Sequence, residues 1–153
     1  MKKAWKLEGG DTVDLISYTK DLLSKRPDIT EISVGSDSQN KKYNTCYVVC
    51  VAFKYGNRGA HCIYYKENVK KIRNRFTRLW GECERSVEIA TLLKLNNVSV
   101  DFVELDFNKK ELTGSNPMVK SSRGFVMGMG FECKVKPDDG LSSCKYADWV
   151  CRT

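Results

Sequence analysis

The sequence has few of the residues that build thiolate or imidazole metal sites. His61 is the only histidine, and none of the seven cysteines is paired in C-x-x-C spacing. Structural zinc sites combine closely spaced cysteines and histidines, so this composition argues against one. Several cysteines instead lie inside apolar runs such as "CYVVCVAF". We expect them to be buried, reduced side chains.

Long hydrophobic segments are also lacking. The N-terminal stretch "MKKAWKLEGGD" carries basic residues without the apolar core of a secretory signal, and no run approaches membrane-spanning length. We therefore expect a cytoplasmic protein with no membrane partner. The length of 153 residues fits one domain, residues 1–153, with an N-terminal helix over about 12–26 and a core over about 30–152. The sequence does not indicate the oligomeric state.

Positive charge is in excess, with 26 lysines and arginines against 19 acidic residues and a formal net charge of +7. This balance favours a polyanionic partner such as nucleic acid, and a well-solvated surface is the alternative. The run "KENVKKIRNRFTRLW" concentrates the charge and adds two aromatic rings for stacking on bases. Ser38 and Gln39 follow Asp37 and are candidates for hydrogen bonds to a sugar or phosphate; the alternative is that they are ordinary turn residues. The candidate nucleic-acid-binding residues are Ser38, Gln39, Lys70, Lys71, Arg73, Arg75 and Arg78.

Hydrophobic periodicity predicts alternating strands and helices. The three consecutive strands are expected to form an antiparallel meander, and the later strand–helix–strand units require parallel pairing. The predicted fold class is therefore α/β, with a mixed five-stranded sheet, helices on both faces and an extra N-terminal helix. The predicted elements are helix 12–25, strand 31–37, strand 44–56, strand 60–67, helix 69–96, strand 98–108, helix 114–131, strand 132–137 and helix 142–153.

Two aspartates follow apolar strand patterns. Asp37 ends the predicted strand of "EISVGSDSQN", and Asp106 ends that of "VSVDFVELDFN". If these strands are adjacent and parallel, both carboxylates lie at the sheet edge where open α/β sheets bind ligands. Two close carboxylates repel each other unless a cation is bound, and hard oxygen ligands suit Mg²⁺ or Mn²⁺. A lone aspartate after a strand is more often a turn residue.

Two further acids lie on predicted helices. Glu82 shares a helix face with Ser86, a small residue that allows the helix to approach the sheet. Glu88 is the alternative to Glu82, although Glu84 and Glu88 together suggest a solvated face. Asp148 lies among the packed-looking aromatic residues of "YADWVCR" in the closing helix.

The segments "VGSDSQ", "ECERSVEIATLL", "VELDFN", "ECKVKPD" and "KYADWVCR" resemble the YkuK-type ribonuclease H-like family over about residues 30–152. The wider superfamily holds two metal ions with acids on the first strand, the first core helix, the end of the fourth strand and the last helix. The resemblance therefore implies catalytic and metal-binding roles for Asp37, Glu82, Asp106 and Asp148, with Glu88 as the alternative helix ligand.

These expectations combine into a nuclease that hydrolyses nucleic-acid phosphodiester bonds with two Mg²⁺ or Mn²⁺ ions. In this hypothesis Asp37 bridges the ions, Glu82 and Asp106 hold one ion, and Asp148 holds the other. The partner is a nucleic acid, with RNA, DNA and hybrid all open. The alternatives are a non-catalytic ribonuclease H-like module that binds nucleic acid or protein, and a small phosphoester hydrolase.

Overall fold

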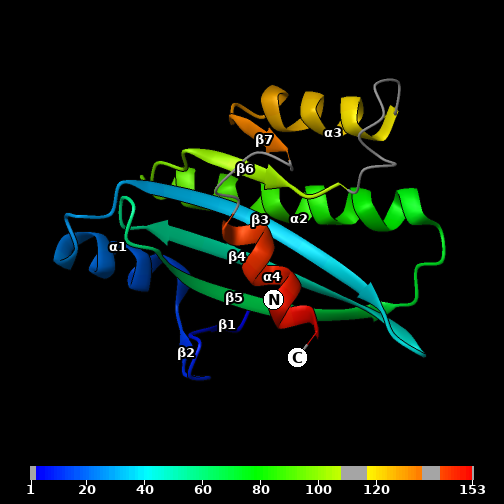
Figure 1. Ribbon diagram of the computed structural model, residues 1–153, viewed down its shortest axis with the longest axis horizontal. Helices are drawn as coiled ribbons and strands as arrows, with labels where there is room; N and C mark the ends of the chain where they lie inside the picture. The colour runs from blue at the N-terminus through cyan, green and yellow to red at the C-terminus, as the bar shows by residue number, and fades with distance from the viewer. Residues whose placement is uncertain (1–2, 108–116, 136–141, 153) are drawn as a thin grey trace.

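The computed structural model describes residues 3–107, 117–135 and 142–152 (Figure 1). Strands and helices alternate after a short N-terminal ribbon, as the sequence predicts. The elements are β1 (Trp5–Lys6), β2 (Thr12–Val13), α1 (Leu15–Lys25), β3 (Glu31–Asn40), β4 (Asn44–Lys54), β5 (Ala60–Lys70), α2 (Arg75–Leu95), β6 (Phe102–Leu105), α3 (Pro117–Gly128), β7 (Cys133–Val135) and α4 (Ser142–Arg152).

The strands form one mixed sheet in the order β2-β1-β5-β4-β3-β6-β7. The meander β3–β4–β5 is antiparallel, whereas β6 pairs parallel to β3 and β7 parallel to β6. Because β6 follows the crossover helix α2, it returns beside β3 in the parallel direction. The predicted α/β class, the meander and the later parallel strands are confirmed.

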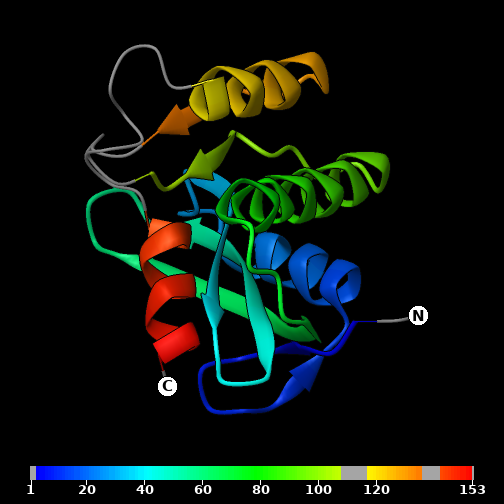
Figure 2. The same ribbon diagram turned by 90° about the vertical axis from the view of Figure 1, so that its right-hand side faces the viewer.

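Helices cover both faces of the sheet (Figure 2). The larger hydrophobic core contains side chains of α1, α2 and α3 packed on one face. A smaller core, with Cys46, Cys50 and Ala147 among its members, lies between α4 and the other face. The described cysteines are free and mostly buried, in agreement with the sequence expectation. Within the described ranges, we find no helix long and apolar enough to cross a membrane.

The predicted number of five strands is wrong, because the described residues form seven. Strands β1 and β2 pair antiparallel with each other, and β1 adds to the free edge of β5 through Lys6 opposite Tyr64. Trp5 is buried and meets the Tyr65 ring edge to face at 4.9 Å, which anchors the ribbon. Strands of two residues are too short to show an alternating pattern, so periodicity cannot reveal them.

The predicted end of the first strand at Asp37 is also wrong. Strand β3 continues through Asn40, and Asp37 pairs with Val48 of β4 in the middle of the hairpin. The long partner strand explains this, because ladder pairing with β4 overrides the poor strand propensity of aspartate. Asp37 is therefore held by a sheet and not by a turn.

Two predicted helix boundaries move toward the C-terminus. Helix α1 begins at Leu15, where the Asp14 carboxylate caps it by accepting from the Ser17 amide at 3.0 Å. Helix α2 begins at Arg75, after β5 has run on to Lys70, and Asn74 caps it. In both places an Asp or Asn cap fixes the start more sharply than hydrophobic spacing does. Residues 108, 114–116, 136–137 and 153 of predicted elements lie outside the described residues.

Candidate active site

Successive side chains of β3 point to opposite faces of the sheet, and the candidate acids use both faces. Ser36 and Ser38 face α2, since their hydroxyl groups hydrogen bond to groups of that helix. Asp37, between them, therefore points to the face covered by α4. Strand β6 pairs with β3 at Ser33 and Val34 and ends at Leu105. Beyond Val34 the edge of β3 has no pairing with β6, and Asp106 follows the end of β6 there. Side chains from the two faces of the sheet therefore approach each other around this edge.

Asp37 lies in a crowded acidic environment on the α4 side. Its carboxyl group hydrogen bonds to that of Asp148, and Asp106 adds a second negative charge. Burial, followed by these two neighbours, raises the pKa of Asp37 to about 7. Asp148 also accepts hydrogen bonds from Arg152 at 3.0 and 3.1 Å, on the exposed side of α4.

Glu82 approaches the same edge from α2, and small polar side chains allow it to do so. The Ser36 hydroxyl donates to the Glu82 backbone carbonyl at 2.6 Å and lies 2.8 Å from the Ser86 hydroxyl. Ser86 is fully buried between helix and strand. The helix therefore sits close against β3 at this turn, as the spacing of Glu82 and Ser86 predicts.

The Glu82 carboxylate is held in place by a short polar chain. Its Oε2 atom accepts from the Ser38 hydroxyl at 2.6 Å, and Arg78 Nη1 lies 2.8 Å from the same hydroxyl oxygen. Glu82 is only 8% exposed. Burial and then the charge of Asp37 raise its pKa well above the usual range, while Ser38 and Arg78 act in the opposite direction. Two carboxyl groups on opposite faces of β3 are therefore both costly to ionise.

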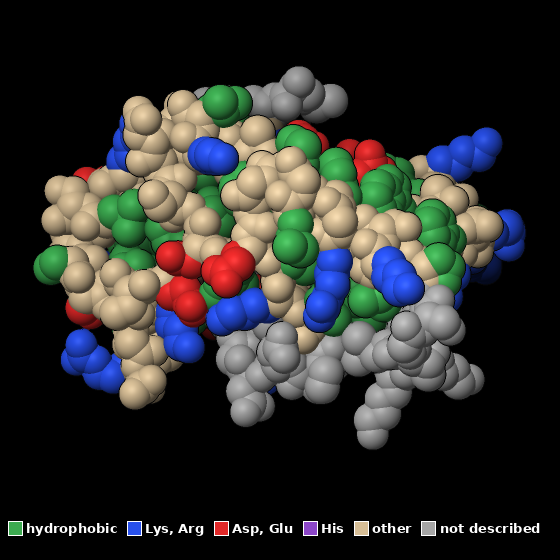
Figure 3. Space-filling view, turned by 90° about the horizontal axis from the view of Figure 1, so that it is seen from above, with side chains coloured by type: hydrophobic (Ala, Val, Ile, Leu, Met, Phe, Trp, Pro, Cys, Tyr) green, Lys and Arg blue, Asp and Glu red, His purple; other side chains and the backbone are tan. Residues whose placement is uncertain are grey.

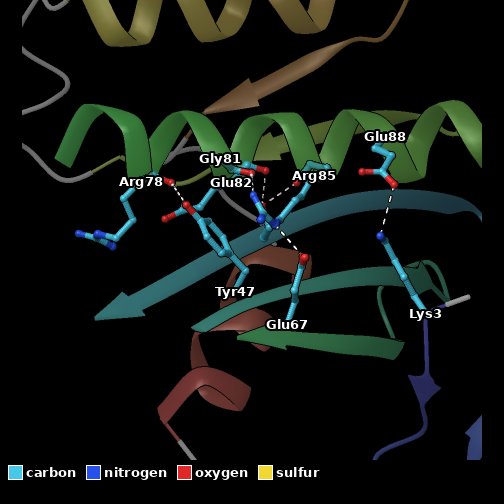
Figure 4. A network of polar contacts seen from close by, with 10 residues as sticks. Lys3, Tyr47, Glu67, Arg78, Gly81, Glu82, Arg85 and Glu88 are labelled. Atoms are coloured by element: carbon cyan, nitrogen blue, oxygen red, sulfur yellow. Dashed lines mark hydrogen bonds and ion pairs between the residues drawn. The ribbon is translucent and has the colours of Figure 1, made fainter. Parts of the chain in front are cut away.

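The structure distinguishes the three glutamates of α2. Glu84 is exposed, and Glu88 is exposed and pairs with Lys3 at 3.4 Å, away from the group formed by Glu82 and Arg78 (Figure 4). Next to Glu82, Gly81 packs against Tyr47, and Arg85 bonds Glu67 across the Tyr47 ring. Of the three, Glu82 alone faces the edge that carries the aspartates, so the alternative Glu88 is not brought to them.

One buried acid was missed by the sequence analysis. Glu104 is 1% exposed on β6, and with Ser36, Glu82 and Asp106 it lines a small cavity of about 10 Å³ between β6 and α2. Fully buried glutamates are rare, so its position beside two candidate acids is notable. The available signal was an acid inside the apolar run "DFVELDF", which strand alternation alone does not single out.

The predicted basic residues separate into two groups. Asp37, Asp106, Asp148 and Glu82 lie around the edge of β3, and we call this region the acidic edge. Arg78 is half-buried and contacts this region through Ser38. Lys70, Arg73 and Arg75 are exposed at the end of β5 and the start of α2. Acidic, basic and hydrophobic side chains are mixed on the face seen from above (Figure 3). The positive charge is therefore assigned to individual residues. Ser38 is buried in strand β3, and Gln39 is half-buried there, so neither is a turn residue.

The donor chemistry of the acidic edge fits a divalent cation. All candidate ligands are carboxylate oxygens, which suit Mg²⁺ or Mn²⁺. The pKa values of Asp37 and Glu82 are raised by burial and then by neighbouring carboxylates, and a bound cation would favour the ionised forms. Within residues 3–107, 117–135 and 142–152, no three His, Cys, Asp or Glu side chains form a ready-made set of metal ligands. The carboxylate side chains have the right chemistry to bind a divalent cation. The carboxyl groups of Asp37 and Glu82, however, lie on opposite sides of β3.

Comparisons with known proteins identify a family for this chain. The family model described as ribonuclease H-like matches residues 14–152. Among solved structures, the crystal structure of RNase H1 from the halophilic archaeon Halobacterium salinarum NRC-1 is similar, with a TM-score of 0.43 and 14% sequence identity over 77% of this chain and 94% of that chain. A comparison with curated proteins gave no match. Because the family model spans nearly the whole chain, the protein belongs to the ribonuclease H-like family.

Proposed function

We propose that the protein is a divalent-metal-dependent nuclease that hydrolyses phosphodiester bonds of nucleic acids at the acidic edge. The observation that supports this proposal is that Asp37 interacts with three other acids. They are Asp148 of α4, Asp106 just after β6, and Glu82 of α2 on the other side of β3. Membership of the ribonuclease H-like family supports the reaction class. A fold alone does not determine an activity, so the proposal depends on these side chains.

In this proposal the four acids would hold two Mg²⁺ or Mn²⁺ ions. When bound, such ions lower the pKa of a coordinated water and stabilise the charge that develops on the phosphate and the leaving oxygen. Asp37 is central, because it interacts with each of the other three acids. A bound cation would favour the ionised form of Asp37, so its proton would be released when the carboxylates act as ligands.

Arg78 and Ser38 have a positioning role in this proposal. The Ser38 hydroxyl donates to the Glu82 carboxylate at 2.6 Å, and Arg78 Nη1 donates to that hydroxyl oxygen at 2.8 Å, so the Glu82 rotamer is set before a ligand arrives. The motifs "GSDSQ" and "YAD", which carry Asp37 and Asp148, support the finer proposal of a YkuK-type member.

The test is a cleavage assay with Mg²⁺ or Mn²⁺ on hybrid, single-stranded and branched substrates. We expect cleavage by the wild type and a loss of at least about 100-fold in Asp37→Asn and Glu82→Gln, as removal of transition-state electrostatics does elsewhere. Glu84→Gln is the matched control on the same helix, and it should keep full activity because Glu84 is exposed.

A second readout does not depend on turnover. Titration of the wild type with Mg²⁺ or Mn²⁺ at pH 7 should release protons, and Asp37→Asn should release fewer. Binding of nucleic acid without metal or cleavage, unchanged in Asp37→Asn, would instead identify a non-catalytic module. Absence of both cleavage and metal binding in the folded wild type contradicts the proposal.

A further inference from the structure

We propose that one end of the molecule binds an unpaired stretch of nucleic acid by stacking its bases on Tyr43 and Phe76; this inference deepens the proposed function by naming its substrate class. We call this end the basic end. It consists of the β3–β4 hairpin tip, the last residue of β5, the segment that joins β5 to α2, and the first turn of α2. Its members are Lys41, Lys42, Tyr43, Lys70, Lys71, Arg73, Arg75 and Phe76.

The two segments of the basic end lie side by side, although about thirty residues separate them in the sequence. Asn44 pairs with Lys70 across β4 and β5. The Asn40 side chain donates to the Ile72 carbonyl at 3.1 Å, and the Ile72 amide donates to Thr45 Oγ1 at 2.9 Å. Both segments appear at the same end of the sheet in Figure 1. The hairpin and the connection therefore form one continuous surface held by hydrogen bonds.

This surface carries positive charge without acidic neighbours along the chain. No aspartate or glutamate occurs over residues 38–66 or 68–81. Among the described residues, no ion pair involves Lys42, Lys70, Lys71 or Arg73. These charges are not neutralised within the described part of the chain, so they complement a polyanion such as a phosphate backbone.

Two aromatic rings are exposed within this positive surface. Tyr43 is 81% exposed at the hairpin tip, with Lys42 Nζ 5.3 Å from its ring centroid. Phe76 is 49% exposed and lies nearly parallel to Trp80, with an interplanar angle of 7°. Exposed rings beside cations are the usual stacking platform for single-stranded nucleic acid, because every base has a π-face. The bases of a duplex already stack on each other, so these rings favour unpaired bases.

The basic end is connected directly to the acidic edge. The Lys41 ammonium donates to the Cys151 backbone carbonyl at 3.1 Å, and the Cys151 thiol lies 3.6 Å from the Asp37 carbonyl oxygen. Asn40 ends β3 only three residues beyond Asp37, which is about 10 Å along a strand. A nucleic-acid strand bound at the basic end would therefore pass next to the acids proposed to cleave it.

The test measures binding in EDTA, so that cleavage does not contribute. Fluorescence anisotropy compares three labelled ligands: a single-stranded oligonucleotide, a blunt duplex and a strand of equal length made of abasic units. The abasic strand has the same phosphates but offers no base to stack. We expect the wild type to bind the single strand more tightly than either of the other two.

Substitutions separate stacking from charge. Tyr43→Ala and Phe76→Ala should each weaken single-strand binding about 5- to 100-fold and leave abasic-strand binding unchanged. Tyr43→Phe keeps the ring and should bind like the wild type. Leu95→Ala, at a residue 75% exposed on the far end of α2, is the matched control. Thermal unfolding checks that each variant is folded, as expected for exposed positions.

Three outcomes overturn the inference. Equal binding of the single strand and the abasic strand, or no effect of the two alanine variants, shows a charged surface without stacking. Tighter binding of the duplex identifies a different ligand class. If Asp37→Asn binds single strands normally but the wild type never cleaves them, the proposed nuclease activity fails while the binding surface stands.

Discussion

Replacing Asp37 by asparagine is expected to stabilise the metal-free protein above pH 7. The pKa of Asp37 rises from its ordinary value of 3.8 to about 7, because the carboxyl group is buried beside Asp148 and Asp106. One pKa unit corresponds to about 1.4 kcal/mol, so ionising Asp37 in the folded state costs up to about 4 kcal/mol. Asparagine has nearly the same shape and no charge, so the variant avoids this cost.

The pH dependence follows from proton linkage. Between about pH 4 and pH 7 the folded state binds the Asp37 proton more strongly than the unfolded state does, so the stability of the wild type falls as pH rises through this range. Above about pH 7 both states have lost the proton, and the full cost remains. The stability difference between Asp37→Asn and wild type should therefore increase from pH 4 to pH 7 and then stay constant.

The assay is thermal unfolding in EDTA at pH 4, 5.5, 7 and 8. A gain of a few kcal/mol in a chain of this length corresponds to a Tm increase of roughly 4–12 °C at pH 8. Asp21→Asn is the matched control, because Asp21 is exposed and pairs with Lys25 on α1. Adding Mg²⁺ should raise the Tm of the wild type more than that of Asp37→Asn, since only the complete acid group binds the ion fully.

A lower Tm for Asp37→Asn at pH 8, or a difference that does not change with pH, would refute the reasoning. The first result would mean that the Asp37 carboxylate is stabilised in the folded state. The second would mean that its proton does not respond to Asp148 and Asp106.

Two further predictions concern packing and charge. Gly81→Ala should destabilise the protein by about 1–3 kcal/mol in urea unfolding, because the new Cβ would collide with the Tyr47 hydroxyl. Gly124→Ala in α3 is the control: the space around it is open, so the better helix propensity of alanine should stabilise the protein by up to about 1 kcal/mol. Similar effects at both positions would contradict this. Binding of single strands should weaken with salt, and Lys71→Ala should reduce the slope of log K against log salt by about one, whereas Lys20→Ala on α1 should leave it unchanged.

The strands of the meander and the crossover helix were predictable because their signals are local. The run "NTCYVVCVAFK" is dense in β-branched and aromatic residues and became β4, and the apolar stripe from Phe76 to Leu93 became α2. Boundaries were less predictable. The continuation of β3 through Asp37 depends on pairing with β4, and the addition of β1 depends on the packing of Trp5 against Tyr65.

The choice among acids shows the same division. Asp106 was identifiable, since it follows a clear strand pattern and the structure places it at the end of β6. The sequence favoured Glu82 over Glu88 because Ser86 lies one turn further along. In the structure Glu82 has the Ser38 hydroxyl at 2.6 Å, whereas Glu88 pairs with Lys3. Burial of Glu104 depends on the covering of β6 by neighbours on both sides, which a single strand does not encode.

The α/β class, the order of the main elements and the candidate acids could be read from the chain, because hydrophobic period and side-chain chemistry are local properties. Three relations became visible only in the folded protein. Asp37 interacts with Asp106 and Asp148, Glu82 lies on the other side of β3, and Arg78 contacts Ser38 beside Glu82 while its basic neighbours lie at the basic end. These are relations between segments far apart in the chain. They are fixed by strand pairing and helix packing, and no local pattern contains them.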